Sequence, residues 1–159
     1  MLARYMSFSC RIFCFTVLAS AFIVASAAAE SSSLVDALKG RDTATALDLV
    51  KQGIDINTPE ADGATALHWA AHFNDIAAAE ALLAAGAQVN VANDYGVTPL
   101  MLAAENGSAD MVGRLLTAGA KTNATMPSGE TALMTASRAG DVGTVSWLLS
   151  KGANPNLTE

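Results

Sequence analysis

The stretch Gly-Val-Thr-Pro-Leu-Met-Leu-Ala-Ala at residues 96–104 decides the fold, because versions of it recur along the chain. A related stretch, Gly-Ala-Thr-Ala-Leu-His-Trp-Ala-Ala, occupies residues 63–71, which is 33 positions earlier. A fixed period of roughly 20–50 residues indicates a repeat protein in which each repeat is one packed unit. The positions that keep the interval are Gly63, Gly96 and Gly129; Thr65, Thr98 and Thr131; Leu67, Leu100 and Leu133; the pairs Leu82-Leu83, Leu115-Leu116 and Leu148-Leu149; and, over four units, Gly53, Gly86, Gly119 and Gly152 together with Asn57, Asn90, Asn123 and Asn156.

Most of these positions have a physical role in a pair of helices. Thr98 suits a helix N-cap, and Pro99 then stands at the first helical position. The leucine pairs fall on the second helix, where they would fill the space between units. Gly86 would end that helix in a left-handed conformation, and Gly96 would permit the tight turn into the next unit. A single pair of helices cannot bury its apolar face alone, so the units must stack.

These motifs resemble a known repeat family. The stretches at 63–71 and 96–104 are similar to the ankyrin signature Gly-x-Thr-Pro-Leu-His-x-Ala-Ala. The endings at 82–90 and 148–156 are similar to the family's Leu-Leu-x-x-Gly-Ala-x-x-Asn. The resemblance covers essentially all of residues 30–159 and implies an all-α ankyrin repeat solenoid, in which helix-turn-helix units are joined by protruding β-hairpin-like loops.

The repeat phase divides this region into four units and places two helices in each. The predicted units are 30–59, 60–92, 93–125 and 126–159. The first unit is degenerate, and its charged residues suit an N-terminal cap whose outer face meets water. The predicted helices cover residues 33–39 and 43–52, 66–72 and 76–84, 99–106 and 109–117, and 132–139 and 142–150.

Residues 1–29 have the form of a bacterial-type secretory signal peptide. Arg4 and Arg11 precede or border an apolar run at 12–25, and small residues near position 29 offer cleavage after Ala27 or Ala29. The run is shorter than the roughly 20 residues that span a bilayer. We therefore expect a periplasmic or secreted product without a membrane anchor, with an uncleaved, membrane-anchoring signal as the alternative.

Cleavage would change the cysteine and charge counts. Both cysteines lie within the signal, so the mature chain would contain none. Two of the nine basic residues would leave, and seven would remain against 15 acidic residues, for a net charge of −8. This charge argues against nucleic acid and against an anionic membrane surface as partners. It favours a protein partner that carries a basic patch.

The histidines and tryptophans have structural interpretations. The family resemblance implies that His68 is a strut that hydrogen-bonds Thr65 and the neighbouring backbone, whereas Met101 and Met134 replace it with apolar packing in the next units. His68 and His72 have zinc-like spacing, but no third ligand is evident, so no metal site is predicted. Trp69 and Trp147 stand where the repeat expects core residues. No catalytic constellation and no cofactor motif are found, so we do not expect an enzyme.

The resemblance also implies where a partner would bind. Family members hold their partners along the concave face, with the hairpin tips and the end of the first helix of each unit. Phe73 and Tyr95 are the most attractive candidates, because aromatic residues anchor interfaces; the alternative for Phe73 is packing against the adjacent hairpin. The predicted partner-binding residues are Asp62, Ala64, His72, Phe73, Asp94, Tyr95, Val97, Glu105, Asn106, Glu130 and Arg138.

The C-terminal unit leaves a second interpretation open. Trp147, Leu148 and Leu149 belong to a unit with nothing stacked after it, whereas a closing repeat would be more polar. Either this end meets a partner or another copy, or the sequence continues in a longer array. The first hypothesis is therefore a monomeric protein-binding module that acts outside the cytoplasm. The alternative is a structural or assembly segment of a longer ankyrin-type array, or a protein that self-associates.

Overall fold

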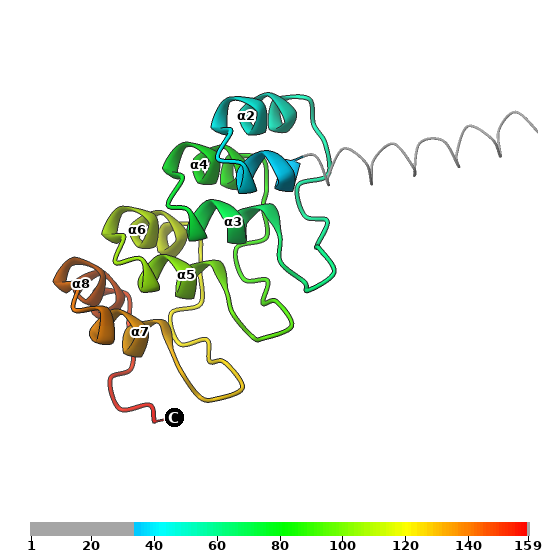
Figure 1. Ribbon diagram of the computed structural model, residues 1–159. Helices are drawn as coiled ribbons and strands as arrows, with labels where there is room; N and C mark the ends of the chain where they lie inside the picture. The colour runs from blue at the N-terminus through cyan, green and yellow to red at the C-terminus, as the bar shows by residue number, and fades with distance from the viewer. Residues whose placement is uncertain (1–33, 159) are drawn as a thin grey trace, which may run out of the picture.

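The computed structural model describes residues 34–158, and within them all regular secondary structure is helical. The helices form two layers, with α3, α5 and α7 in one layer and α2, α4, α6 and α8 in the other (Figure 1). The loops that precede α3, α5 and α7 protrude beyond the helices. The bounds are α2 Thr43–Lys51, α3 Ala66–His72, α4 Ile76–Ala84, α5 Pro99–Glu105, α6 Ala109–Thr117, α7 Ala132–Ala139 and α8 Val142–Ser150, and a helical segment at 34–39 precedes them.

The predicted all-α solenoid is confirmed, and the predicted helices agree closely with those observed. Helices α2 and α5 each end one residue earlier than predicted, because Gln52 and Asn106 act as their C-caps. The predicted hairpin-like loops carry a single antiparallel bridge, Thr125 to Thr131, among the described residues. The predicted signal peptide at 1–29 lies outside the described part of the chain.

Side chains at the start of the helices fix where they begin. Thr98 accepts a hydrogen bond from the Met101 N–H, and Pro99 follows it at the first helical position, as predicted. Aspartate caps two helices of the layer that contains α2, α4, α6 and α8: Asp75 accepts from the Ala78 N–H of α4, and Asp141 accepts from the Thr144 N–H of α8. These caps satisfy amide groups that the first turn of a helix leaves without a partner.

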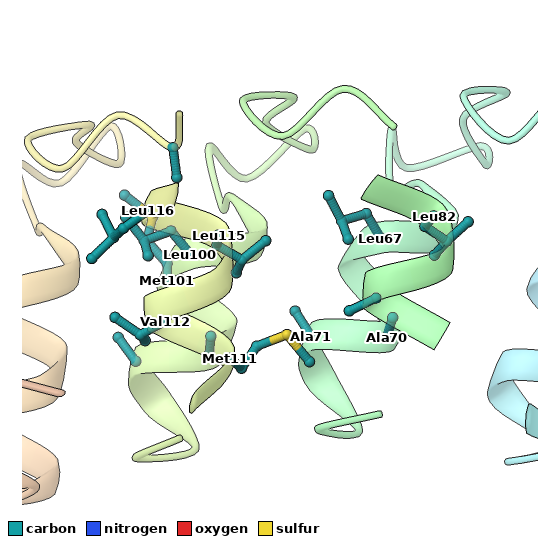
Figure 2. Packing of buried hydrophobic residues seen from close by; sticks show 14 of the residues in the cluster. Leu67, Ala70, Ala71, Leu82, Leu100, Met101, Met111, Val112, Leu115 and Leu116 are labelled. Atoms are coloured by element: carbon teal, nitrogen blue, oxygen red, sulfur yellow. The ribbon is translucent and has the colours of Figure 1, made fainter. Parts of the chain in front are cut away.

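The core lies between the two layers and between successive units (Figure 2). Ala70 and Ala103 are fully buried, and their small side chains let α3, α5 and α7 approach one another. Leu82 and Leu115, the first members of their leucine pairs, are also fully buried, as predicted. Each unit therefore contributes to a continuous core that it could not form by itself.

Asparagine side chains connect each unit to the next. The Asn90 Nδ2 group donates to the Gly119 carbonyl at 3.0 Å, and the Asn90 Oδ1 atom accepts from the Lys121 N–H at 2.7 Å. Asn57 and Asn123 make the same pair of bonds to the following unit. The repeated asparagine is thus a bridge between units that satisfies two backbone groups in one loop of the following unit.

The prediction that Trp147 is a core residue is wrong. Its side chain is 41% exposed, and its ring lies against α6 at Gly113, where an added Cβ would be 3.2 Å from Trp147 Cε2. The physical reason is that Trp147 lies on the outer side of α8, where the absence of a side chain at Gly113 leaves room for an indole. Trp69, in contrast, is half-buried and packs against the core.

Candidate partner-binding surface

Three hairpins form one edge of the stack. Each is closed by a backbone hydrogen bond, from Glu60 to Ala64, from Asn93 to Val97, or from Met126 to Glu130. We call residues 60–64, 93–97 and 126–130 the first, second and third hairpins. The Asp94 N–H of the second hairpin donates to the Asp62 carbonyl of the first at 2.8 Å, so neighbouring tips are in direct contact.

The predicted partner-binding residues differ widely in exposure. Ala64 is only 4% exposed, so its side chain cannot contribute to a contact surface and it is left out of the surface proposed below. Asp62, Phe73, Val97 and Glu130 are half-buried; His72, Asp94, Tyr95, Glu105, Asn106 and Arg138 are exposed. We call this set without Ala64 the hairpin surface.

Tyr95 is the most prominent apolar group of the hairpin surface. Its side chain is 69% exposed at the tip of the second hairpin. Only its backbone is held, because the Tyr95 N–H donates to Asn93 Oδ1 at 3.1 Å. The ring pairs found among residues 34–158 do not include Tyr95, so its ring is presented by a hydrogen-bonded backbone without packing on another ring.

Phe73 belongs to an aromatic cluster with Trp69 and His72. The Phe73 ring is stacked on Trp69 with centroids 5.9 Å apart, and it meets His72 edge-on at 4.8 Å. His72 also meets Trp69 in a T-shaped arrangement at 5.9 Å. Phe73 therefore packs on side chains of its own helix, and it contributes to the surface as part of this aromatic cluster rather than alone.

Two cations from the first unit cover one side of the aromatic cluster. Lys39 Nζ lies 4.6 Å from the Trp69 ring centroid, and Arg41 Cζ lies 5.2 Å from that of Phe73. Glu60 joins these groups, because its carboxylate accepts from Lys39 Nζ and, at 2.6 Å, from Trp69 Nε1. The sequence indicates only a capping role for Lys39 and Arg41, since the degenerate first unit gives no repeat phase by which to place their side chains. Glu60 does have a repeat position, but its counterparts Asn93 and Met126 are not acidic, so the periodicity gives no signal for it.

His68 is the predicted strut. Its Nδ1 atom accepts the Thr65 N–H at 3.0 Å and lies 2.9 Å from Thr65 Oγ1. Its Nε2 atom lies 3.1 Å from the Val97 carbonyl oxygen. Because that oxygen can only accept, the hydrogen is on Nε2. Both ring nitrogens are thus engaged in the fold, which leaves neither for a metal shared with His72.

Burial lowers the pKa of His68, because desolvation disfavours the charged imidazolium; the Val97 hydrogen bond and the Asp62 charge oppose this shift. The unfolded chain takes up a proton as the pH falls through about 6.5, whereas folded His68 does so only at lower pH. The contribution of His68 to stability is therefore complete above the unfolded pKa and declines as the pH falls from there toward the folded pKa.

We expect His68→Met to flatten the pH dependence of stability between about pH 7 and about pH 5, because methionine does not titrate. Methionine suits the position, since Met101 fills its counterpart in the third unit and is buried. Urea unfolding at a series of pH values measures the effect. Equal slopes of the free energy of unfolding against pH for wild type and His68→Met over this range would show that His68 has no lowered pKa.

The capping groups Asp42 and Asp141 also have lowered pKa values, because their side chains accept hydrogen bonds from Thr45 and Thr144, but they titrate below about 3.8.

Two predicted contact residues also have structural bonds. Asn106 Nδ2 donates to the carbonyl groups of Ala71 at 3.1 Å and His72 at 2.7 Å, which caps the C-terminal end of α3. Glu130 forms an ion pair with Arg138 and accepts a hydrogen bond from Thr135 Oγ1 at 3.0 Å. These bonds fix the surface, and the Glu130–Arg138 ion pair reduces the free charge of its fourth-unit part.

Among residues 34–158, no group of three or more His, Cys, Asp or Glu side chains is arranged to hold a metal ion. None of the helices in that range has the length and apolar character needed to span a bilayer.

A family model for ankyrin repeats, described as three copies, matches residues 23–126 and 92–159. No curated protein matches the sequence.

Proposed function

The chain belongs to the ankyrin repeat family, and from that premise we propose that it is a non-catalytic module that binds a protein partner on the hairpin surface. Ankyrin repeats are in general modules of protein–protein interaction, and the family is typically not enzymatic. The observation that carries the proposal is Tyr95, whose ring is 69% exposed on a hairpin tip that the fold holds in place. Aromatic side chains held in this way are frequent anchors of protein interfaces.

Charge supports a partner with a basic patch. Asp94 and Glu105 are exposed on the hairpin surface, and the half-buried Asp62 contacts Asp94 through its backbone carbonyl. None of these three carboxylates takes part in the ion pairs formed among residues 34–158. The one cation of the set, Arg138, is paired with Glu130. A surface of this sign attracts basic partners and speeds their association.

Partner capture by chemical crosslinking in intact cells tests this proposal. We expect a Phe73→Ala, Tyr95→Ala double variant to capture at least about tenfold less partner, because a single aromatic hot spot contributes about 2 kcal/mol to binding. The Tyr95→Ala single variant separates binding from stability, because Phe73→Ala also removes a ring from the aromatic cluster. Val142→Ala is the control, since Val142 is 79% exposed on an outer helix. Equal capture by wild type and the double variant would reject the hairpin surface.

We further propose that the protein acts in the periplasm or outside the cell. The support is the form of residues 1–29, with flanking arginines, an apolar run and small residues before Glu30. The first residue of the chain recovered from cells decides the matter. A chain that starts at Ala28 or Glu30 would agree with export and cleavage, whereas a chain that retains Met1 would contradict cleavage.

A second candidate function is self-association through the last unit. Leu149 is 46% exposed, whereas Leu116, which has the same repeat position one unit earlier, is 7% exposed. Leu149 lines a cavity of about 260 Å³ with Met134, Val145 and Leu157. The mass of the purified protein in solution separates the two functions, because a stable monomer at high concentration would contradict self-association.

A further inference from the structure

We infer that a small cavity on the hairpin surface receives a lysine or arginine side chain of the partner. The inference rests on the proposed function and specifies the chemistry of its partner. The cavity has a volume of about 160 Å³ and lies between the first two hairpins and helices α3 and α5. We call it the cation pocket; its principal lining residues are Asp62, Trp69, His72, Asn93 and Leu102.

The size and the walls of the cation pocket suit a long basic side chain. A volume of about 160 Å³ is the share of roughly five water molecules in the liquid, which is enough for a guanidinium group or for an ammonium group with part of its stem. Trp69 and Leu102 are half-buried and give the pocket apolar walls for the methylene groups. Trp69 also offers the aromatic surface that attracts cations.

Asp62 supplies the charge that the pocket requires. Its Oδ1 atom accepts a hydrogen bond from the Ala64 N–H at 3.0 Å, and this bond fixes the position of the carboxylate within the first hairpin. The ion pairs formed among residues 34–158 do not include Asp62, and neither lysine nor arginine lines the pocket. The pocket thus combines a carboxylate with an aromatic wall, and its lining includes His68 and His72 but no lysine or arginine.

The same aromatic cluster already holds cations on its other side. Lys39 lies over Trp69 and Arg41 over Phe73, and Arg41 lines a separate cavity with Trp69 and Phe73. Both of these cations come from the first unit. The cation pocket lies on the side of the third unit, which contributes Asn93 and Leu102 there and no basic residue. A cation from a partner would therefore occupy a position on this side comparable to those of Lys39 and Arg41 on the other.

Peptide titration tests the cation pocket directly. The probe is an acetylated and amidated peptide in which arginine alternates with serine, and the matched peptide has glutamine in place of arginine. Binding to the chain as recovered from cells is followed by tryptophan fluorescence in a Trp147→Phe background, where Trp69 is the remaining tryptophan. We expect the arginine peptide to bind and to change the Trp69 emission, and the glutamine peptide to bind at least about tenfold more weakly.

Two carboxylate variants distinguish the pocket from general attraction to an acidic protein. Asp62→Asn keeps an oxygen for the Ala64 N–H and removes the charge, so it should fold and bind the arginine peptide about tenfold more weakly. Asp110→Asn removes one charge from an exposed position on α6 and should change the affinity less than about twofold. Equal losses from the two variants, or no loss from Asp62→Asn, would overturn the cation pocket.

The native partner separates this inference from the proposed function. If crosslinked partner is lost in Tyr95→Ala but retained in Asp62→Asn, the cation pocket is wrong and the proposed function stands. If both variants lose the partner while Asp110→Asn retains it, the cation pocket is supported. If neither Tyr95→Ala nor Asp62→Asn loses the partner, both proposals are wrong.

Discussion

Replacing Leu116 by alanine is expected to lower the free energy of unfolding by about 2–5 kcal/mol, the range for large-to-small changes in a packed core. Leu116 lies on α6 and is 7% exposed, and α6 packs against both α4 and α8. The substitution would leave a cavity between the third and fourth units. In a linear stack of repeats, stability depends on the interfaces between neighbouring units. The weakened interface should therefore also make the third and fourth units unfold less cooperatively. Urea denaturation followed by circular dichroism measures both effects.

Leu149→Ala provides the matched comparison. Leu149 occupies the same repeat position on α8 but is 46% exposed. Removing its side chain gives up little buried area, so the expected loss is about 1 kcal/mol or less. Similar losses from Leu116→Ala and Leu149→Ala would mean that burial in the stack does not determine stability at this position, which would contradict the packing described above.

Gly96→Ala is expected to destabilise the protein by about 2–5 kcal/mol, through backbone strain and steric conflict together. Gly96 has a φ of +77°, a conformation that costs an alanine roughly 1–2 kcal/mol. In addition, a Cβ at this position would lie 2.5 Å from Pro127 Cδ, so the third hairpin would have to move. Thermal and urea unfolding measure the loss.

Gly119→Ala isolates the backbone part of this effect. Gly119 has a φ of +91°, but a Cβ there would meet nothing within 4 Å. We therefore expect Gly119→Ala to cost roughly 1–2 kcal/mol, which is less than the cost of Gly96→Ala. Equal costs for the two variants would show that the second and third hairpins do not approach each other as closely as the structure has them.

The helices could be predicted closely from the sequence because their signals are local and repeated. Thr98 and Pro99 mark the start of α5, and Gly86 follows the end of α4, so each unit confirms the phase of the others. The asparagine bridges could not be predicted in this way. The partners of Asn90 are backbone groups about 30 residues later, and only the stacking of the units brings them together.

The candidate site was predictable in outline and less so in detail. Repeat position correctly placed Tyr95 on an exposed tip, but it also selected Ala64, which the fold buries. Trp147 was misplaced because the periodicity of α8 does not show that Gly113 leaves room for its ring on the outer side. The cations beside Trp69 and Phe73 come from the degenerate first unit, where the repeat offers no guide to side-chain position.

Site-specific photo-crosslinking shows whether the hairpin surface binds a protein partner. A benzoylphenylalanine at position 95 would replace an aromatic side chain that is 69% exposed, and one at position 142 would occupy a position on α8 that is 79% exposed. We expect a crosslinked protein of defined mass from position 95 and none from position 142 after irradiation of intact cells. Crosslinking from position 142 without any from position 95 would contradict binding at the hairpin surface.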